Sequence, residues 1–503
     1  METLGLLMDG FAVALSWQNV LLALVGCFIG TIVGALPGLG PVNGVAILIP
    51  LAFSLGLSPV SSMILLSCVY YGCMYGGRIS SIMLNIPGDE PSIMTCIDGH
   101  PMAKQGKGPE ALAISAVSSF IGSLIATIGL IIFAPLLVQV AIQFGPAEYF
   151  ALFLMAFLTI GGVTGGNPGK TLLAACVGLA IGTVGIDPMS GVPRFTFGIF
   201  SLYDGFNIIV AVVGLFAISE VLVLIETGSG SQFTGVRMNR TMVRMSEVTP
   251  TFGAALRGSG IGFIAGILPG AGASLGSFLA YILEKRVSDT NGTFGKGDPR
   301  GVAAPEAGNN SAAGGALVPM LSLGVPGSGT TAILLAMLIS LNITPGPLLF
   351  RDQPDLVWGL IAALLFANFV LLVMNLPLVG VFTRMLTMPM WILMPFVVMI
   401  SSIGVYSINR STFDLMVMVG FGVFGYLMRK IELPLIPIVL GLLLGADMES
   451  YLRRALQISG GNPGVLFESG IAIGIYAICA LFLALAVFVA VRKPKIGAES
   501  YQA

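Results

Sequence analysis

The sequence GTIVGALPGLG (residues 30–40) decides the fold, because a closely similar sequence recurs in the second half of the chain. Residues 262–272 read GFIAGILPGAG, and the two stretches share the pattern GxxxGxxPGxG at every defined position. A second pair follows in the same order, LNIPGD at residues 84–89 and LGVPGS at residues 323–328. The offsets are similar, 232 residues (position 38 to 270) and 239 residues (position 87 to 326). This order and spacing indicate an internal structural repeat.

The chain has the composition of a membrane protein. Of its 503 residues, 56% are hydrophobic and 9% are charged, and the mean hydropathy is +0.96, whereas soluble domains carry about a quarter charged residues. A transmembrane helix needs roughly 20 mostly apolar residues. The chain is therefore predicted to be an all-α polytopic membrane protein with about ten to twelve transmembrane helices. The predicted spans lie near residues 17–36, 58–75, 111–144, 147–163, 170–186, 205–226, 251–268, 355–383, 389–407, 412–428, 433–446 and 470–491.

Composition and motifs exclude several other classes of protein. The formal net charge is −1, so the chain lacks the basic surface that nucleic-acid binding requires, and we expect no nucleic-acid partner. The glycines at positions 270, 272 and 276 resemble a nucleotide-binding loop, but that motif needs a βαβ context, and here both flanks are membrane helices. The single histidine, His100, is predicted to lie in a loop. We therefore expect a protein that is not an enzyme and that binds no organic cofactor.

The distribution of Lys and Arg predicts the orientation of the chain. These residues are frequent around 236–257 and in the C-terminal tail, whereas the first 77 residues contain neither. By the positive-inside rule the linker and the tail are cytoplasmic and residues 1–16 are periplasmic. The two repeats are then inverted relative to each other, although Arg453 and Arg454, on the predicted outer side, count against this scheme. The predicted units are a first membrane repeat at 1–235, a cytoplasmic linker at 236–257, a second membrane repeat at 258–465, and a closing helix with a cytoplasmic tail at 466–503.

This orientation is directly testable. Cysteines or reporter fusions are introduced into residues 1–16, into the linker and into the tail, and their accessibility is measured in intact cells. We expect the N-terminus to react from the periplasm and the other two positions to react from the cytoplasm. If the N-terminus and the linker are found on the same side, the inverted-repeat scheme is wrong.

The Pro-Gly pairs inside apolar stretches predict broken helices, and the binding site is expected at these breaks. In hydrocarbon an unpaired backbone group is costly, so a break persists only where protein or a water-filled cavity receives the freed groups. Helix N-termini expose N–H groups that suit a carboxylate, and unwound backbone carbonyls suit a sodium ion, whose ligands we expect among them. Most candidate substrate- and ion-binding residues lie at or beside the four breaks: Pro37, Gly38, Gly40, Asn43, Asn85, Pro87, Gly88, Pro269, Gly270, Gly272, Ser274, Pro326, Gly327, Ser328, Thr330 and Thr331. Two more candidates, Asn309 and Asn310, belong to a polar group just before the apolar stretch that leads to Pro326.

Two simpler explanations compete with a binding role. Gly and other small residues allow close helix packing, as GxxxG does in membrane dimers, and Ser or Thr hydroxyls often bond back to their own helix. Three charged residues, Arg78, Asp89 and Glu306, are further candidates. Arg78 can hold a substrate carboxylate or form an ion pair with Asp89 or Glu90. Glu306 is either a functional acid at membrane depth or, after Pro305, a first-turn residue at the membrane interface.

Longer motifs carry a family resemblance. The stretches ALPGLGPVNGVAILIPL, LNIPGDEPS, CIDGHPMAKQGKGPEAL, GILPGAGASLGSFLAY and APEAGNNSAAGGALVPMLSLGVPGS closely resemble the large membrane subunit of the tripartite tricarboxylate transporters, the TctA type. The resemblance runs from about residue 20 to 465. It implies cation-driven secondary uptake of a di- or tricarboxylate in the bacterial inner membrane, with a small membrane subunit (TctB type) and a periplasmic solute-binding protein (TctC type) as partners. It also implies an elevator-like movement of a substrate-bearing domain.

The resemblance leaves the substrate and the coupling ion open. Arg78 departs from the family pattern, in which we expect a small hydroxyl residue after Tyr-Gly-Gly. Sodium is the expected coupling ion, because the side chains beside the breaks are mostly neutral Ser, Thr and Asn. The alternative is a proton-coupled carrier for another small organic anion, since Asp89 and Glu306 can carry protons. A channel is a further alternative, but a channel is expected to show a single filter, whereas two matched pairs of broken helices suit alternating access.

Overall fold

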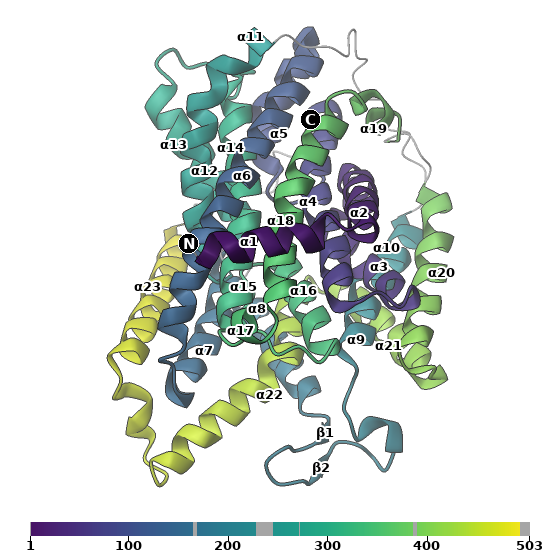
Figure 1. Cartoon of the computed structure of the whole chain (residues 1–503), viewed down its shortest axis with the longest axis vertical. Helices are drawn as coiled ribbons and strands as arrows, with labels where there is room; N and C mark the ends of the chain where they lie inside the picture. The colour runs from purple at the N-terminus through teal and green to yellow at the C-terminus, as the bar shows by residue number, and fades with distance from the viewer. Residues whose placement is uncertain (1, 164–167, 228–244, 271, 386–389, 493–503) are drawn as a thin grey trace.

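The computed structural model describes residues 2–163, 168–227, 245–270, 272–385 and 390–492. In these ranges the protein is almost entirely helical, and the strands that are described form one short hairpin. Figure 1 shows an elongated bundle with this hairpin at one end of the long axis and α11 at the other. The predicted all-α class is confirmed.

The first half of the chain contains ten α-helices and the hairpin within the described ranges. The elements are α1 (Glu2–Ala14), α2 (Trp17–Ala35), α3 (Gly40–Ser54), α4 (Pro59–Leu84), α5 (Ile93–Met102), the π-helical turn η1 (Ala103–Lys107), α6 (Gly108–Ala141), α7 (Pro146–Val163), α8 (Pro168–Gly182), β1 (Gly185–Ile186), β2 (Pro193–Arg194), the 3-10 turn η2 (Phe200–Leu202), α9 (Ile208–Val213), the π-helical turn η3 (Gly214–Ile218) and α10 (Ser219–Thr227).

The second half, like the first, contains long helices and two breaks at which a helix ends and another begins. Its elements are α11 (Met245–Val248), η4 (Thr249–Thr251), α12 (Phe252–Ile267), α13 (Gly272–Ser288), α14 (Arg300–Gly315), α15 (Leu317–Leu323), α16 (Gly329–Ser340), α17 (Leu349–Asp352), α18 (Pro354–Asn375), α19 (Val379–Met385), α20 (Met390–Asn409), α21 (Thr412–Lys430), α22 (Leu435–Ile458), η5 (Pro463–Phe467) and α23 (Gly470–Arg492).

Many of these helices have the length and apolarity of membrane spans. Among the described residues seven helical segments are long and apolar enough to cross a membrane, and seven shorter apolar helices accompany them. Each apolar stretch predicted from the sequence coincides with a helix, except that 355–383 divides into α18 and α19. The long spans are Trp17–Ala35, Pro59–Leu84, Ile93–Ala141, Ile208–Glu226, Pro354–Asn375, Thr412–Lys430 and Leu435–Ile458.

The two halves share backbone conformation at the first pair of breaks. Leu36 after α2 and Leu268 after α12 are both extended, with ψ of 119° at each. The glycines that follow have positive φ in both halves, +86° and +61° at positions 38 and 40, and +78° and +64° at positions 270 and 272. Glycine adopts these angles without a Cβ penalty. The breaks therefore occur where the sequence predicted them, and the PGxG pattern specifies their shape.

The second pair of breaks is matched in the same way. Asn85 ends α4 in the left-handed region with φ +58°, and Gly324 ends α15 there with φ +72°. These two residues occupy equivalent positions in LNIPGD and LGVPGS. Asn tolerates the left-handed conformation better than other residues with a side chain. The first role of Asn85 is therefore to end a helix.

The GxxxG glycines allow two helix pairs to make backbone contact. A Cβ built on Gly30 or Gly34 of α2 falls 2.3 or 2.1 Å from a carbonyl oxygen of α4. A Cβ built on Gly262 or Gly266 of α12 falls 2.1 or 2.3 Å from a carbonyl oxygen of α14. These four glycines act in packing, as GxxxG does between membrane helices. They hold α4 and α14, which precede the second pair of breaks, directly against the helices that precede the first pair.

One local expectation is wrong, and two segments add helix that was not foreseen. His100, expected in a loop, lies in α5, with its Nδ1 3.0 Å from the Ile82 carbonyl oxygen. The predicted linker is in part helical, because α11 and η4 occupy residues 245–251 and α12 begins at Phe252. The rest of that linker, 236–244, and the tail beyond Arg492 lie outside the described residues. The sequence also did not predict α1, which lies across α18 (Figure 1) and packs Gly10 against Trp358.

The hairpin at the end of the molecule is tied to α22 by ion pairs. Arg194 of β2 pairs with Asp187 at 2.8 Å and with Glu449 of α22 at 2.9 Å, and Arg453 pairs with Asp187 at 2.9 Å. Hydrogen bonds from Ser190 and Arg453 hold the pKa of Asp187 below its usual range. The charge of Arg453, which counted against the orientation scheme, is therefore locally neutralised by acids.

Candidate functional site

The four breaks meet at one cavity. Its volume is about 410 Å³, within the range of roughly 300–1,000 Å³ that is usual for small-molecule sites. The candidates that line it are Gly38, Gly40, Pro87, Gly88, Asp89, Gly270, Gly272, Ser274, Ser328 and Thr330. The candidates that lie outside its lining are Pro37, Asn43, Arg78, Asn85, Pro269, Glu306, Asn309, Asn310, Pro326, Gly327 and Thr331. The fold thus brings together segments that are more than two hundred residues apart in sequence.

Four helices begin at the wall of this cavity. The first residues of α3, α13 and α16 (Gly40, Gly272 and Gly329) line it, as does Ile93, the first residue of α5. Each helix N-terminus presents backbone N–H groups without an intrahelical partner and carries about half a positive charge. Such an arrangement favours an anion. One donor of α16 is already used, because the Thr331 N–H is capped by the Ser328 hydroxyl at 3.3 Å.

Two acidic side chains also line the cavity. Asp89 Oδ1 accepts hydrogen bonds from the Ser92 backbone N–H, at 3.0 Å, and from the Ser92 hydroxyl. Asp89 Oδ2 is buried and has no hydrogen-bond partner among the described residues. The neighbouring Glu90 is exposed, and its Oε2 accepts a hydrogen bond from the Ser274 hydroxyl at 3.2 Å. This hydrogen bond connects the loop of the second break to the start of α13, which follows the third break.

Arg78 is completely buried and does not form the ion pair considered above. Its guanidinium donates to the Tyr75 carbonyl at 2.8 Å, to the Leu112 carbonyl and the Ser115 hydroxyl at 2.7 Å each, and to Asn375 Oδ1 at 3.0 Å. All of these partners are neutral oxygens on α4, α6 and α18. Carbonyl, hydroxyl and amide oxygens of neighbouring helices therefore satisfy its donors in place of a carboxylate. In the structure Arg78 connects three long helices.

Glu306 lies in the interior of α14 and is completely buried, so the interfacial first-turn interpretation is wrong. Its two carboxylate oxygens accept hydrogen bonds from the hydroxyls of Thr95 on α5 and Ser119 on α6. Neighbouring Asn309 is also buried, and neither polar atom of its side chain has a partner among the described residues. Asn310 donates to the Glu306 carbonyl at 3.0 Å, one turn back in its own helix. These residues form a buried polar cluster in α14, which Thr95 connects to α5 and Ser119 connects to α6.

Asn43 also connects the site to distant helices. Its Nδ2 donates to Glu220 Oε2 of α10 at 3.2 Å, and Arg429 of α21 pairs with the same oxygen. Asn43 therefore lies in α3 beyond the cavity and joins that broken helix to α10 and α21. Asn85 lines a separate cavity beside α5, together with His100 and Lys104.

Comparison of the sequence with known proteins identifies the family of the chain. The sequence model described as the tripartite tricarboxylate transporter TctA family matches residues 20–440. The chain belongs to the TctA family. It is 38% identical over 495 residues, 98% of each chain, to a protein of Agrobacterium vitis described as an uncharacterized 52.8 kDa protein in the TAR-I ttuC' 3' region. A second protein of that organism, described as an uncharacterized protein in the TAR-II ttuC' 3' region, is 38% identical over 234 residues, 46% of this chain and 97% of its own length. No solved structure matches the chain.

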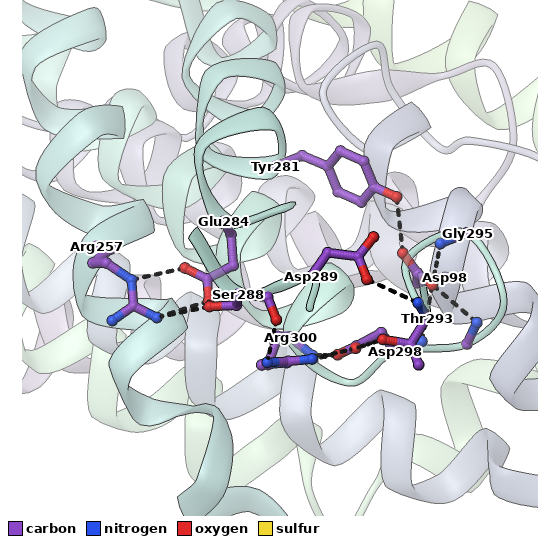
Figure 2. Close-up of polar contacts among 11 residues, drawn as sticks. Asp98, Arg257, Tyr281, Glu284, Ser288, Asp289, Thr293, Gly295, Asp298 and Arg300 are labelled. Carbon is purple, nitrogen blue, oxygen red and sulfur yellow. Dashed lines mark hydrogen bonds and ion pairs between the residues drawn. The ribbon is translucent and has the colours of Figure 1, made fainter. Parts of the chain in front are cut away.

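This TctA-family protein also contains a polar clamp that the sequence did not predict, shown on the right of Figure 2. Asp98 of α5 is buried, and its Oδ1 accepts hydrogen bonds from the backbone N–H groups of Gly295, Gly297 and Asp298 at 2.8–2.9 Å. Its Oδ2 accepts from the Tyr281 hydroxyl of α13 at 3.0 Å. The loop between α13 and α14 is thus wrapped around one carboxylate from the other half of the chain. The local signal was the FGKGD turn, in which Gly295 and Gly297 have φ of +83° and +99°.

A second chain of contacts extends this clamp, on the left and in the centre of Figure 2. Arg257 of α12 pairs with Glu284 of α13 at 2.7 Å, and Arg300 of α14 pairs with Asp298 at 2.7 Å and donates to the Ser288 carbonyl at 2.9 Å. Burial raises the pKa of Asp298, but hydrogen bonds from Arg300 and Thr293 outweigh it and lower that pKa below its usual value. The clamp joins α5, α12, α13 and α14 at the end of the molecule nearest α11.

Replacing Asp98 by alanine is expected to loosen this end of the protein. The change leaves three backbone donors and the Tyr281 hydroxyl without their acceptor, and each buried unsatisfied group costs about 1–3 kcal/mol. We expect a clearly lower thermal midpoint of the purified protein and faster protease cleavage in residues 289–299. Asp98→Asn keeps an acceptor oxygen and is expected to lie between the wild type and Asp98→Ala. An unchanged midpoint for Asp98→Ala contradicts the clamp.

Proposed function

We propose that this protein is the large permease subunit of a tripartite carrier that takes up a small di- or tricarboxylate by sodium-coupled secondary active transport. A periplasmic solute-binding protein delivers the substrate, and a small membrane subunit accompanies the permease in the bacterial inner membrane. The observation that supports the proposal most strongly is the convergence of four helix N-termini on one cavity. Membership of the TctA family supports the tripartite partnership.

The cavity recognises the substrate mainly through its backbone. Backbone N–H groups at the starts of α3, α13 and α16 are available to carboxylate oxygens, and the helix dipoles favour negative charge. At the start of α5 the Ile93 and Thr95 N–H groups already donate to the Glu90 and Ser92 carbonyls, so this helix contributes mainly through its dipole. The Thr330 hydroxyl adds a donor at the same wall, whereas the Ser274 hydroxyl already donates to Glu90. A small carboxylate with two or three acidic groups meets donors from several directions at once. A binding site of this kind discriminates by the spacing of the carboxylates.

The matched breaks also supply a route to alternating access. Carriers with repeated, broken helices hold the substrate at the junction of the repeats and move one unit relative to another. Here both pairs of breaks keep the same backbone angles in the two halves, at Gly38 and Gly270 and again at Asn85 and Gly324. Two conformations of similar energy are a natural consequence of such a repeat. This symmetry favours a carrier over a channel.

Uptake is expected to require a sodium gradient. Carbonyls freed at the breaks, with Ser and Thr oxygens beside them, are hard oxygen ligands that suit sodium. The measurement is uptake of labelled citrate, as a tricarboxylate probe, into proteoliposomes that contain both membrane subunits, with the binding protein outside. We expect uptake with an inward sodium gradient and only background without it. Undiminished uptake driven by a pH gradient alone, with sodium absent, contradicts sodium coupling and favours the proton-coupled alternative.

A further inference from the structure

Two acidic side chains offset the positive helix ends of the candidate cavity before any substrate enters. Asp89 and Glu90 line the cavity, and none of the described residues of its lining is Lys, Arg or His. The four helix N-termini together supply about two positive charges, which these two carboxylates match. A di- or tricarboxylate therefore adds negative charge to a cavity that is close to neutral. Its binding is favoured by a positive charge that the described lining does not provide.

Asp89 is the group best placed to hold that charge. Its two oxygens differ, because Oδ1 receives two hydrogen bonds from Ser92 whereas Oδ2 is buried with no partner among the described residues. Asp89 as a whole is half-buried, but a charged oxygen that is itself removed from water is usually paired or coordinates a metal ion. Glu90 does not share this property, since it is exposed and accepts a hydrogen bond from Ser274. Of the two acidic side chains in the cavity, Asp89 is therefore the one with a buried oxygen that lacks a partner.

Two glycines and a backbone carbonyl oxygen lie close to Asp89. A Cβ built on Gly40 lies 3.7 Å from the Asp89 Cβ and 3.8 Å from the Gly88 carbonyl oxygen, so the start of α3 faces the loop of the second break closely. A Cβ on Gly77 of α4 falls 3.2 Å from Asp89 Oδ1. Among the described residues no group of three or more His, Cys, Asp or Glu side chains is assembled to hold a metal ion. One carboxylate among neutral oxygens suits a monovalent cation better than a divalent one, because divalent sites gather several charged ligands.

We propose that Asp89 binds a sodium ion through Oδ2, and that the sodium-occupied cavity is the form that binds the carboxylate substrate. The second part rests on the proposed function, whereas the cation site rests on the geometry of Asp89 alone. Bound sodium gives the nearly neutral wall a net positive charge, which attracts the carboxylate. By linkage, sodium raises the affinity for the carboxylate by the same factor as the carboxylate raises the affinity for sodium.

The cation site is tested first without substrate. The purified full chain in lipid nanodiscs is heated at increasing sodium chloride, with choline chloride keeping the ionic strength constant. We expect the thermal midpoint to rise with the logarithm of the sodium concentration, because sodium binds the folded state. Asp89→Asn is expected to need about tenfold more sodium or higher for the same rise, the scale of one lost charged ligand. Asp89→Glu keeps a carboxylate and retains part of the response. Glu90→Gln removes a charge from the same cavity but no ion ligand, and shifts the response less than Asp89→Asn.

Two results overturn the proposal. A sodium response in Asp89→Asn equal to that of the wild type places the ion elsewhere. Stabilisation of the wild type by lower pH, with no response to sodium, shows that Asp89 holds a proton and no metal ion. Citrate is then added with and without sodium, and we expect its stabilising effect to depend on sodium only when Asp89 is present. A sodium response that depends on Asp89, without any effect of citrate or of shorter dicarboxylates, supports the cation site and rejects the proposed function.

Discussion

Gly266→Ala is expected to remove most of the folded protein, whereas Gly260→Ala in the same helix is expected to have no such effect. A Cβ at Gly266 falls 2.3 Å from the Ala312 carbonyl oxygen, which is backbone of α14 and cannot rotate away. α12 and α14 must then separate by roughly an ångström along a close-packed interface, at a cost of about 1–3 kcal/mol or more. A Cβ at Gly260 meets nothing within 4 Å. The measurement is the yield of monodisperse protein after extraction, together with its thermal midpoint.

The equivalent change in the first half tests whether the packing is repeated. Gly34 of α2 is closer still to its neighbour, with a Cβ 2.1 Å from the Cys73 carbonyl oxygen. We expect Gly34→Ala to behave as Gly266→Ala does. Equal yields for Gly34→Ala, Gly266→Ala and Gly260→Ala show that the interfaces can relax, and contradict the packing role of the GxxxG glycines.

Alanine at the tips of the breaks is expected to reduce transport strongly while the protein still folds. Gly38 and Gly272 have φ of +86° and +64°, and a Cβ on either meets nothing within 4 Å. The cost is therefore conformational, about 1 kcal/mol or more per site, and the backbone relieves it by rotating the N–H groups that line the cavity. We expect sodium-dependent counterflow of citrate to fall by about tenfold or more, the effect of roughly 1.4 kcal/mol in binding. Gly40→Ala and Gly270→Ala are expected to act in the same way.

Gly460→Ala is the matched control for these variants. Gly460 lies between α22 and η5, has φ of +65°, and also has open space around the position of a Cβ. The same strain is thus introduced far from the cavity, and we expect a similar small loss of stability with normal counterflow. Normal counterflow in all four tip variants contradicts a backbone binding site, and leaves the Pro-Gly breaks as packing features.

The positions of the breaks were predictable because local stereochemistry determines them. Proline lacks an N–H donor, and glycine reaches positive φ without a steric penalty, so PGxG inside an apolar stretch interrupts a helix whatever surrounds it. Asn85 and Gly324 show the same principle, since both are residues that tolerate the left-handed conformation in which they end α4 and α15. The internal repeat strengthened the prediction, because each motif occurs once in each half of the chain.

The partners of the charged residues were not predictable from their neighbours in the sequence. Arg78 is eleven positions from Asp89 in the chain, and an ion pair was a reasonable expectation. In the fold it turns to carbonyl, hydroxyl and amide oxygens of α4, α6 and α18. Glu306 follows a proline, which suggested a helix start, yet Pro305 lies inside α14 and the carboxylate is fully buried. Tertiary packing overrode the local signal at both positions.

By itself the sequence determined the membrane class, the family motifs, the four breaks and the conformation of the glycines within them, because these depend on composition and on sterics over a few residues. The tertiary structure alone decided that four helix N-termini share one cavity, that Asp89 Oδ2 remains unpartnered there, and that Asp98 gathers the loop between α13 and α14. The cavity and the Asp98 contacts join segments from both halves of the chain. The state of Asp89 Oδ2 depends on which donors the fold places within hydrogen-bond distance of it. Such contacts are set by how helices pack in three dimensions, and no periodicity or motif within one segment encodes them.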